Sequence, residues 1–409
     1  SDHTLLMSQA IKTAIYERGV GHLVFPDNVQ PMAAPAGGEA STPQGRTADL
    51  RVAPAAGSLD AAIKTLSNAK RPMIIVGYGA LEGMPEVIQL AETLSAPIAT
   101  TFKAKGQIAD AHLLAAGVLG RSGTPIASWF MNEADVLLVF GASFSDHTGI
   151  YPTKATIQVD NDPMRLGKRH PVDMPLLGAV TVTAQQLAAA LDETSLAGTD
   201  QRDEIAERWS LWRTEKTNRL GENNAKGISA AALFDSMTRL TPADAVIAVD
   251  VGNNTYSFGR YFEPAANQRV LMAGYLGSIG FSFPAAMGAW AATQEDGPYT
   301  GRKVVSVSGD GGFGQYAMEF TTAVKYGMNI THILMNNAEL GKITKEQKAA
   351  EFAVWQTSLE NPSFAAFARA CGGMGVRVKK REDLDDAIRA AIAHEGPSLV
   401  EVMTDAELV

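Results

Sequence analysis

The sequence predicts an α/β protein with two doubly wound parallel-sheet domains, preceded by the remnant of a third domain. Short apolar segments such as Pro72–Val76 and Val136–Phe140 alternate with segments of helical periodicity, a pattern typical of parallel sheets covered by helices on both faces. The 409 residues exceed what one hydrophobic core usually supports. A polar, charge-rich stretch at 193–227 separates the two alternating series, and we expect it to hold a connecting helix and linker.

The N-terminal residues 1–30 are predicted to be the tail of a larger unit. Residues 4–19 have helical periodicity, with Leu5 and Ile11 on one face, and Gly21–Phe25 is predicted to be a short strand. One helix and one strand cannot bury a core, so the rest of this unit is expected outside the chain. Residues 31–57 are rich in Ala, Pro, Gly, Ser and Thr, which is typical of a surface linker.

Residues 58–192 are predicted to form the first complete domain. A helix at Leu59–Ser67 precedes the buried strand Pro72–Val76, and a helix at Met84–Leu94 follows it. Further strands are predicted at Pro97–Thr100, Val136–Phe140 and Thr156–Val159.

Residues 228–409 are predicted to form the second α/β domain. Ser229 can cap a helix that runs through Met237, because its hydroxyl can accept from a free backbone N–H of the first turn. Strands are predicted at Ala245–Val249, Lys303–Ser308, Ile330–Met335, Val376–Val378 and Ser398–Met403, and helices near Pro362–Ala370 and at Leu384–His394.

The overall composition restricts the function classes. The net charge of −9, from 35 basic and 44 acidic residues, argues against general affinity for nucleic acids or anionic membranes. Cys371 is the single cysteine, so no intrachain disulfide can form. No run of eighteen apolar residues is present, so we expect a cytoplasmic enzyme or binding protein without a membrane segment.

The most informative motif is Gly309-Asp310-Gly311, followed by Asn336-Asn337. Each element comes directly after an apolar run, so both are expected at the carboxyl ends of buried parallel strands, where ligands of open α/β sheets bind. An acidic and an amide side chain offer the hard oxygen ligands that suit Mg²⁺, and the glycines let backbone N–H groups approach a diphosphate. The alternative is that the Gly-Asp-Gly element is only a turn.

Other segments support the interpretation of this motif as a metal and diphosphate site. Asp250–Gly252, Leu276–Phe281 and Pro284–Ala289 precede it in the order and spacing of the diphosphate-binding domain of thiamine-diphosphate enzymes. More narrowly, the chain resembles the pyruvate oxidase / acetolactate synthase family in segments that include Gly77–Ala80, Ile157–Pro163 and Asn336–Gly341. The resemblance extends over essentially the whole chain and is most specific in its C-terminal part.

The resemblance implies a domain order of pyrimidine-binding, middle and diphosphate-binding domains. Residues 1–30 would be the C-terminal tail of the pyrimidine domain, residues 58–192 the nucleotide- or FAD-binding-like middle domain, and residues 228–409 the diphosphate- and Mg²⁺-binding domain. The family's catalytic glutamate belongs to the pyrimidine domain and is expected outside this chain. The chain would then be a fragment or one subunit of a split enzyme. The family's cofactor lies between two subunits, which implies a dimer or tetramer.

The resemblance also assigns residues to the cofactor site. Asp310, the side chain of Asn337 and the main-chain carbonyl of Glu339 would bind Mg²⁺. Ile279 would support the bent cofactor, although an ordinary core isoleucine is the alternative. The carbonyl of Gly277 would accept from the 4′-amino group. The full set of cofactor-binding candidates is Gly252, Asn253, Asn254, Gly277, Ser278, Ile279, Gly309, Gly311, Gly312, Asn337, Leu340 and Gly341.

Lys342 marks a departure from the family, whose members tend to carry a large apolar residue here, facing the substrate. We therefore expect that Lys342 or Glu346 faces the reaction pocket and selects a polar or anionic substrate. The alternative is a solvated, charged helix start, because runs of charge usually form exposed faces.

The predicted function is thiamine-diphosphate- and Mg²⁺-dependent decarboxylation of a 2-oxo acid, similar to that of pyruvate oxidases. Three alternatives stay open: an acetolactate synthase-type carboligase, a non-oxidative 2-oxo acid decarboxylase, and a non-catalytic subunit that binds cofactor only with a partner chain. Whether the middle domain binds FAD is also open, because a glycine turn after a strand is too short a signal.

Overall fold

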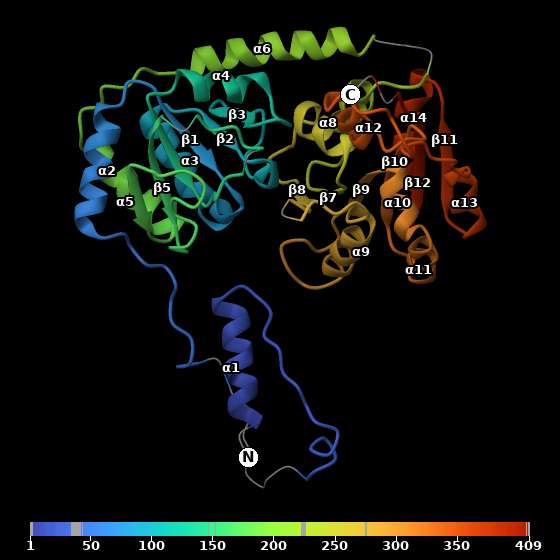
Figure 1. Ribbon diagram of the computed structural model, residues 1–409, viewed down its shortest axis with the longest axis horizontal. Helices are drawn as coiled ribbons and strands as arrows, with labels where there is room; N and C mark the ends of the chain where they lie inside the picture. The colour runs from blue at the N-terminus through green and yellow to red at the C-terminus, as the bar shows by residue number, and fades with distance from the viewer. Residues whose placement is uncertain are drawn as a thin grey trace. The chain divides into compact units, whose positions relative to one another are not determined.

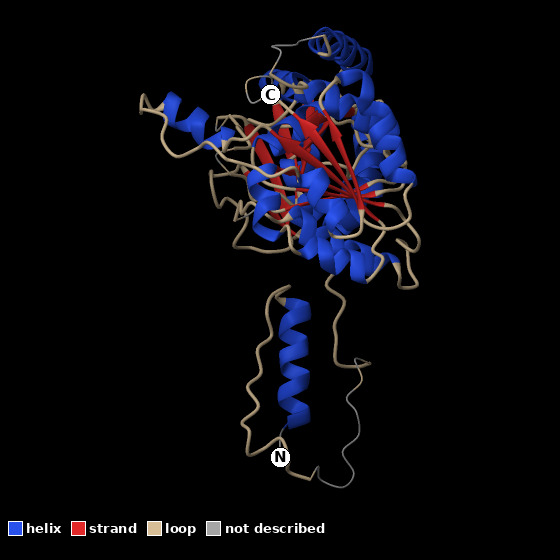
Figure 2. Ribbon diagram, turned by 90° about the vertical axis from the view of Figure 1, so that its right-hand side faces the viewer, coloured by secondary structure: helices blue, strands red, loops and turns tan. Residues whose placement is uncertain are grey.

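The computed structural model describes residues 3–33, 42, 44–145, 147–151, 153–221, 226–274, 276–405 and 407. The chain divides into two compact units, Ser1–Val52 and Ala53–Val409. The larger unit contains two six-stranded sheets, each flanked by helices (Figures 1 and 2). Among the described residues, no helix is both long and apolar enough to cross a membrane.

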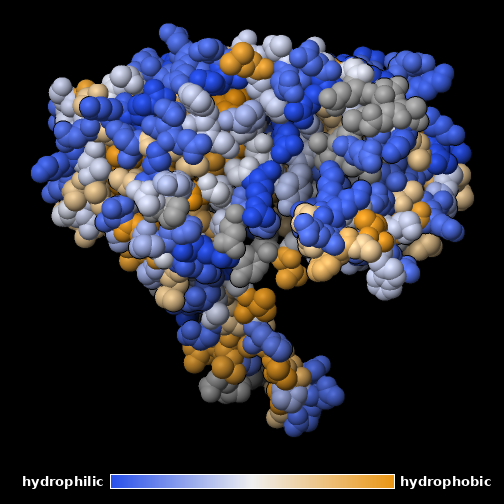
Figure 3. Space-filling view, turned by 45° about the horizontal axis from the view of Figure 1, so that its top comes forward, coloured by the Kyte–Doolittle hydropathy of each residue, from blue (hydrophilic) through white to orange (hydrophobic). Residues whose placement is uncertain are grey.

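The N-terminal unit contains one helix, α1 (His3–Tyr16), and none of its residues is buried within the described structure. The predicted strand Gly21–Phe25 is wrong: these residues have no regular structure. The physical reason is that a strand needs a partner for its backbone N–H and C=O groups, and the described part of this unit offers none. Apolar side chains are therefore exposed, among them Leu5, Ile11 and Val24. Figure 3 shows the exposed apolar surface of the molecule in orange.

The predicted linker at 31–57 is described only in part, because residues 34–41 and 43 lie outside the described residues. Residues 44–55 contain turns and irregular backbone, and the next helix, α2, begins at Ala56.

The first sheet has the strand order β3-β2-β1-β4-β5-β6, and all its pairs are parallel. Apolar runs at β1 and β4 form strands at the residues that the sequence predicted, because both are buried along their whole length. The strands β3 and β6 were not predicted, since each is only four residues long and contains Gly or Pro. The bounds are β1 Pro72–Val76, β2 Ile98–Thr100, β3 Ala115–Val118, β4 Val136–Phe140, β5 Ala155–Asp160 and β6 Met174–Leu177.

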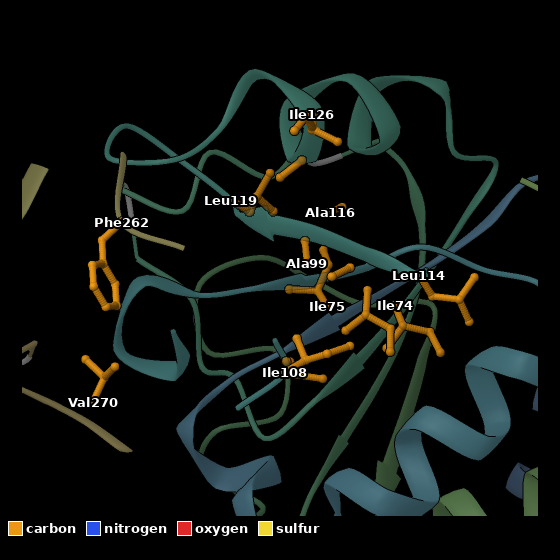
Figure 4. Close-up of a cluster of buried hydrophobic side chains, with 14 of the residues drawn as sticks. Ile74, Ile75, Ala99, Ile108, Leu114, Ala116, Leu119, Ile126, Phe262 and Val270 are labelled. Carbon is orange, nitrogen blue, oxygen red and sulfur yellow. The ribbon is translucent and has the colours of Figure 1, made fainter. Parts of the chain in front are cut away.

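Helices cover this sheet with their apolar faces. The helix α5 packs against α2 and α3, while α4 packs against α6 and β3. Figure 4 shows part of the buried core, which includes Ile74, Ile75 and Ala99 of the sheet and Ile126 of α4. The helices are α2 Ala56–Asn68, α3 Met84–Leu94, α4 Pro125–Glu133 and α5 Val180–Asp192, with short 3₁₀ turns η1 Tyr78–Gly83 and η2 Phe102–Ala104.

The helix α6 (Arg202–Arg219) lies within the predicted connecting stretch and contacts both sheet domains; residues 222–225 of that stretch lie outside the described residues. The indole Nε1 of Trp209 donates to the carbonyl of Ala115 in the first domain at 2.7 Å. On the other side, Trp212 stacks on Tyr261, with ring centroids 6.0 Å apart.

The second sheet has the order β11-β12-β10-β9-β7-β8, again with parallel pairs throughout. The chain passes from β7 outward to β8 and then returns to the opposite side of β7 for β9 and β10. The point of reversal therefore lies between β7 and β9. The bounds are β7 Val246–Val249, β8 Arg269–Met272, β9 Val304–Gly309, β10 Ile330–Asn336, β11 Met374–Val378 and β12 Ser398–Met403.

The helices of this domain begin where the sequence offers caps or glycines. Ser229 caps α7 as predicted, because its hydroxyl accepts from the backbone N–H of Ala232 at 3.2 Å. The helices are α7 Ala230–Leu240, α8 Asn253–Tyr261, α9 Ser282–Thr293, α10 Asp310–Tyr316, α11 Glu319–Lys325, α12 Gly341–Ala349, α13 Phe364–Ala370 and α14 Leu384–Ala393, with the 3₁₀ turn η3 at Arg381–Asp383.

The strand register brings the ends of three strands together. Met335 of β10 pairs with Gly309 of β9, and Val249 of β7 pairs with Val307 of β9. The loops that follow β7, β9 and β10 therefore meet at one edge, next to the reversal point, which is where open α/β sheets bind ligands.

Candidate functional site

A cleft lies at this edge and opens to solvent. The cleft brings together most of the residues predicted from the sequence: Gly252, Asn253, Asn254, Ile279, Gly309, Asp310, Gly311, Gly312, Asn337, Glu339, Leu340, Gly341 and Lys342. Thr404 and Asp405, after β12, also line it and were not predicted.

Three predicted residues do not line the cleft. Gly277 and Ser278 are exposed on the loop between β8 and α9, where Gly277 has a φ of 71°. Glu346 is also exposed, but its carboxylate lies 2.8 Å from the Nζ of Lys342, so it contacts a residue that does line the cleft.

Three helices begin at the cleft, and none of the three has a side-chain cap. Their N-caps are Gly252 for α8, Gly309 for α10 and Leu340 for α12. The first backbone N–H groups of a helix have no partner inside the helix, and the helix dipole favours negative charge there. The Nδ2 of Asn253 is likewise buried without a hydrogen-bond partner. Uncapped N–H groups and an unpaired amide donor fit an anionic group such as a diphosphate.

Asp310 is 3% exposed and is the carboxylate of the predicted metal site. Its Oδ2 accepts from the backbone N–H of Ala338 at 2.8 Å and from the Nδ2 of Asn361 at 2.7 Å, and its Oδ1 accepts from the N–H of Gly311 at 3.0 Å. Burial raises the pKa of Asp310, against the opposing effect of these hydrogen bonds.

Asn337 and Glu339 lie beside Asp310 on the turn after β10. The Oδ1 of Asn337 accepts from the backbone N–H of Glu339 at 3.1 Å. Ala338, between them, has a φ of 55°, a left-handed conformation that only a tightly held turn maintains in a residue other than glycine. The carboxylate of Glu339 accepts from the hydroxyl of Thr344.

The donor set fits a hard divalent cation. One carboxylate, one amide oxygen and one carbonyl are the oxygen ligands with which Mg²⁺ is bound when phosphates supply the rest. Among the described residues, no group of three or more His, Cys, Asp or Glu side chains could hold a metal by itself.

Asp250 was part of a predicted motif, but the sequence did not reveal its role. It is fully buried after β7, and its carboxylate accepts from the N–H groups of Gly280 at 3.1 Å and Phe281 at 3.0 Å. Asp250 thereby fastens the loop that carries Ile279. A Cβ on Gly312 would lie 2.1 Å from the Oδ2 of Asp250, so only glycine fits there. An acidic residue directly after a buried strand is the sequence signal that could have found it.

His332 supports the site from inside the sheet. It is fully buried on β10, and its ring nitrogens lie 3.0 Å from the hydroxyls of Ser306 and Ser308 on β9. Its ring stacks on Phe313 of α10, with ring centroids 4.5 Å apart. Burial lowers the pKa of His332 to about 3, so the imidazole is neutral at physiological pH.

The first sheet has a reversal point of its own, between β1 and β4. Gly77 and Gly141 follow these strands with their backbones in close contact, since a Cβ on Gly77 would lie 2.2 Å from the carbonyl oxygen of Gly141. After β5, the Oδ2 of Asp160 is buried and has no hydrogen-bond partner. The strand order is that of dinucleotide-binding folds, which bind their ligand at this edge.

Two family models match this chain, one in each of the two sheet domains. Residues 59–187 match the family model described as thiamine pyrophosphate enzyme, central domain. Residues 250–402 match the model described as thiamine pyrophosphate enzyme, C-terminal TPP binding domain. The chain belongs to the thiamine pyrophosphate enzyme family, as its sequence predicted.

Several curated relatives align along most of this chain. The thiamine pyrophosphate-containing protein YdaP of Bacillus subtilis is 31% identical over 403 residues, which are 97% of this chain and 67% of the relative. Sulfoacetaldehyde acetyltransferase of Rhodobacter capsulatus is 30% identical over 402 residues, 90% of this chain and 66% of the relative. The acetolactate synthase isozyme 3 large subunit of Escherichia coli is 28% identical over 350 residues, 82% of this chain and 59% of the relative. The chain thus spans about three fifths to two thirds of the length of these relatives.

The buried imidazole of His332 predicts a specific pH dependence of stability. Its pKa is about 3 in the folded chain and near the ordinary value of 6.5 in the unfolded chain. Below pH 6.5 the unfolded chain binds a proton that the folded chain excludes, so the free energy of unfolding falls as the pH drops towards 3. One such proton changes that free energy by about 1.4 kcal/mol per pH unit.

Replacement of His332 by Gln should therefore remove about 1.4 kcal/mol per pH unit from the pH dependence of unfolding in the window between the two pKa values. Urea unfolding of both proteins across this pH range measures it. The matched control is His22→Gln, because His22 is exposed. Equal slopes for the parent and the His332→Gln variant would contradict a neutral buried imidazole.

Proposed function

We propose that this chain binds thiamine diphosphate and Mg²⁺ in the cleft after β7, β9 and β10, and that it takes part in decarboxylation of a 2-oxo acid. The observation that carries the proposal is the convergence of three uncapped helix N-termini on the carboxylate of Asp310. Positive helix ends would attract the diphosphate, and the carboxylate would bind the metal ion that accompanies it.

In this proposal the chain holds the cofactor at its charged end. Asp310, the amide oxygen of Asn337 and the carbonyl of Glu339 bind Mg²⁺. The backbone N–H groups of Gly312 and Gly341 donate to the diphosphate, as does the unpaired Nδ2 of Asn253. The predicted donors Gly311 and Leu340 are already engaged, with the Oδ1 of Asp310 at 3.0 Å and the carbonyl of Thr357 at 2.7 Å, respectively. Ile279 supports the organic part of the cofactor. When bound, thiamine diphosphate supplies the electron sink that decarboxylation of a 2-oxo acid requires.

A pyruvate oxidase-like reaction with FAD in the middle domain is the first candidate for the overall activity. Two features of the first sheet support FAD: the strand order of dinucleotide-binding folds and the buried, unpaired Oδ2 of Asp160. A bound flavin would give the purified protein a yellow colour and flavin absorbance. A colourless protein would favour simple decarboxylation.

A carboligase or acyl-transfer reaction is the second candidate, because relatives along most of the chain are named acetolactate synthase and sulfoacetaldehyde acetyltransferase. We further propose that the family's catalytic glutamate is supplied from outside the described residues. It would come from another copy in a homo-oligomer or from a separate chain that carries the pyrimidine domain. The products formed from pyruvate distinguish these reactions. Acetolactate would indicate carboligation, whereas acetaldehyde would indicate simple decarboxylation.

The metal assignment predicts the effect of replacing Asp310. Asp310→Ala removes the carboxylate, so Mg²⁺-dependent binding of thiamine diphosphate should weaken at least tenfold, the lower end of the effects seen when metal-site residues are changed. Isothermal titration calorimetry with and without Mg²⁺ measures this. Asp296→Ala is the control, because Asp296 is exposed in the same domain. Unchanged Mg²⁺-dependent affinity in Asp310→Ala would refute the metal site.

Lys342 is the proposed determinant of substrate charge. It lies half-buried at the cleft, its Nζ is 5.0 Å from the ring centroid of Tyr256, and the hydrogen bond to Glu346 raises its pKa. Lys345 lies close to it, and the pKa of Lys345 is lowered first by desolvation and then by the nearby charges of Arg260 and Lys342. Three cationic side chains therefore lie close together here. Such a group favours a substrate that carries negative charge.

Lys342→Met should therefore lower kcat/KM for 2-oxo acids with a second anionic group by about tenfold, equivalent to about 1.4 kcal/mol, relative to pyruvate. The holoenzyme is assayed with both substrate types. Lys348→Met, on the exposed part of the same helix, should leave the ratio unchanged. An unchanged ratio in Lys342→Met would place Lys342 on an ordinary solvated helix start.

A further inference from the structure

Three N–H donors contact the carboxylate of Asp310, two of them at Oδ2. Both the backbone N–H of Ala338 and the Nδ2 of Asn361 donate to Oδ2, at 2.8 and 2.7 Å. The Oδ1 accepts from the N–H of Gly311, the residue next in the chain. The contacts therefore fix the rotation of the carboxylate through Oδ2 and leave Oδ1 with lone-pair capacity at the cleft.

Asn361 reaches Asp310 from a segment 51 residues further along the chain. Its Nδ2 also donates to the Oδ1 of Asn336 at 3.0 Å. Because both partners of this NH₂ group are oxygen acceptors, the amide of Asn361 has a single orientation that satisfies them. Asn361 thus links the residue after β9 to the last residue of β10.

Asn336 is oriented in turn by a buried carboxylate. Its Nδ2 donates to the Oε1 of Glu401 at 2.8 Å, and this fixes its Oδ1 towards Asn361. Asn336 and Glu401 are 1% and 0% exposed, so water does not compete for these hydrogen bonds. A hydrogen-bonded series therefore runs from Glu401 through Asn336 and Asn361 to Asp310.

Glu401 also fastens the segment that carries Asn361. Its Oε2 accepts from the backbone N–H of Ala365 at 3.0 Å and from the hydroxyl of Ser363 at 3.3 Å. Arg377 lies 3.6 Å from Oε1. The start of α13 is thereby attached to β12, and Asn361, two residues before Ser363, is held at a fixed distance from the cleft.

From this geometry we infer that Asn361 is a positioning residue for the metal site. Supported by Asn336 and Glu401, it fixes the carboxylate of Asp310 and leaves Oδ1 available for a cation. Binding would then avoid the loss of rotamer entropy that a free carboxylate would bear. Partners of metal ligands that set their orientation typically contribute 10- to 100-fold to metal affinity. This inference rests on the proposed function, because it concerns the Mg²⁺ that Asp310 is proposed to bind.

The test measures Mg²⁺ binding to the full chain by isothermal titration calorimetry with thiamine diphosphate present, together with thermal unfolding without either ligand. In Asn361→Leu, which removes both hydrogen bonds, the Mg²⁺ dissociation constant should rise by about tenfold or more. Asn361→Ser retains one donor and should give an intermediate value. It also serves as the second variant if Asn361→Leu does not fold.

The matched control is Asn329→Leu. Asn329 is half-buried like Asn361 and hydrogen-bonds the Nζ of Lys303, but it lies before β10, at the opposite end of that strand from the cleft. Metal-free unfolding temperatures should fall in both Leu variants, whereas Mg²⁺ affinity should fall only in Asn361→Leu. Parent-like Mg²⁺ affinity in Asn361→Leu would overturn the inference and leave the series a purely structural one. If the parent chain itself binds no Mg²⁺ with the cofactor, the proposed metal site fails, and this inference fails with it.

Discussion

The common alignment of β7, β9 and β10 is the constraint on which the rest of the site depends. Parallel pairing sets the register. Because the two faces of β9 pack in different apolar clusters, a one-residue shift would move Val305 and Val307 out of the cluster that they fill and onto the opposite face. With that register, the residues after the three strands meet at one edge. Each of them is then part of a single cleft instead of three separate turns.

Burial of polar groups at this edge is costly, and the structure offsets the cost with backbone donors. Asp250 and Asp310 are both almost fully buried, and each accepts N–H groups from a loop of the cleft. Burial of a carboxylate without hydrogen-bond partners would lower the free energy of unfolding by roughly several kcal/mol. The same hydrogen bonds that offset this cost attach the loops to the strand ends. The cleft is consequently preformed, which reduces the entropy lost when a cofactor binds.

The two sheet domains use one architectural rule for different purposes. Both have their reversal point flanked by glycine turns, but the first domain closes its turns backbone to backbone at Gly77 and Gly141, whereas the second keeps a cleft open. The helix α6 contacts both domains through Trp209 and Trp212. This division agrees with the two family models, of which the C-terminal one is named for cofactor binding.

The sequence by itself determined the long, fully apolar strands and the chemistry that follows them. Asp310 and Asn337 were identifiable because a residue directly after a buried strand has its place in the fold set by local pattern. Asn361 and Glu401 were not, because their roles arise only when segments 51 and 65 residues away from Asp310 and Asn336, respectively, pack against the same strands. The tertiary structure likewise decided that β3 and β6 form short strands and that Gly21–Phe25 does not. Short strands exist where a neighbouring strand pairs with their backbone, and local sequence carries no record of that neighbour.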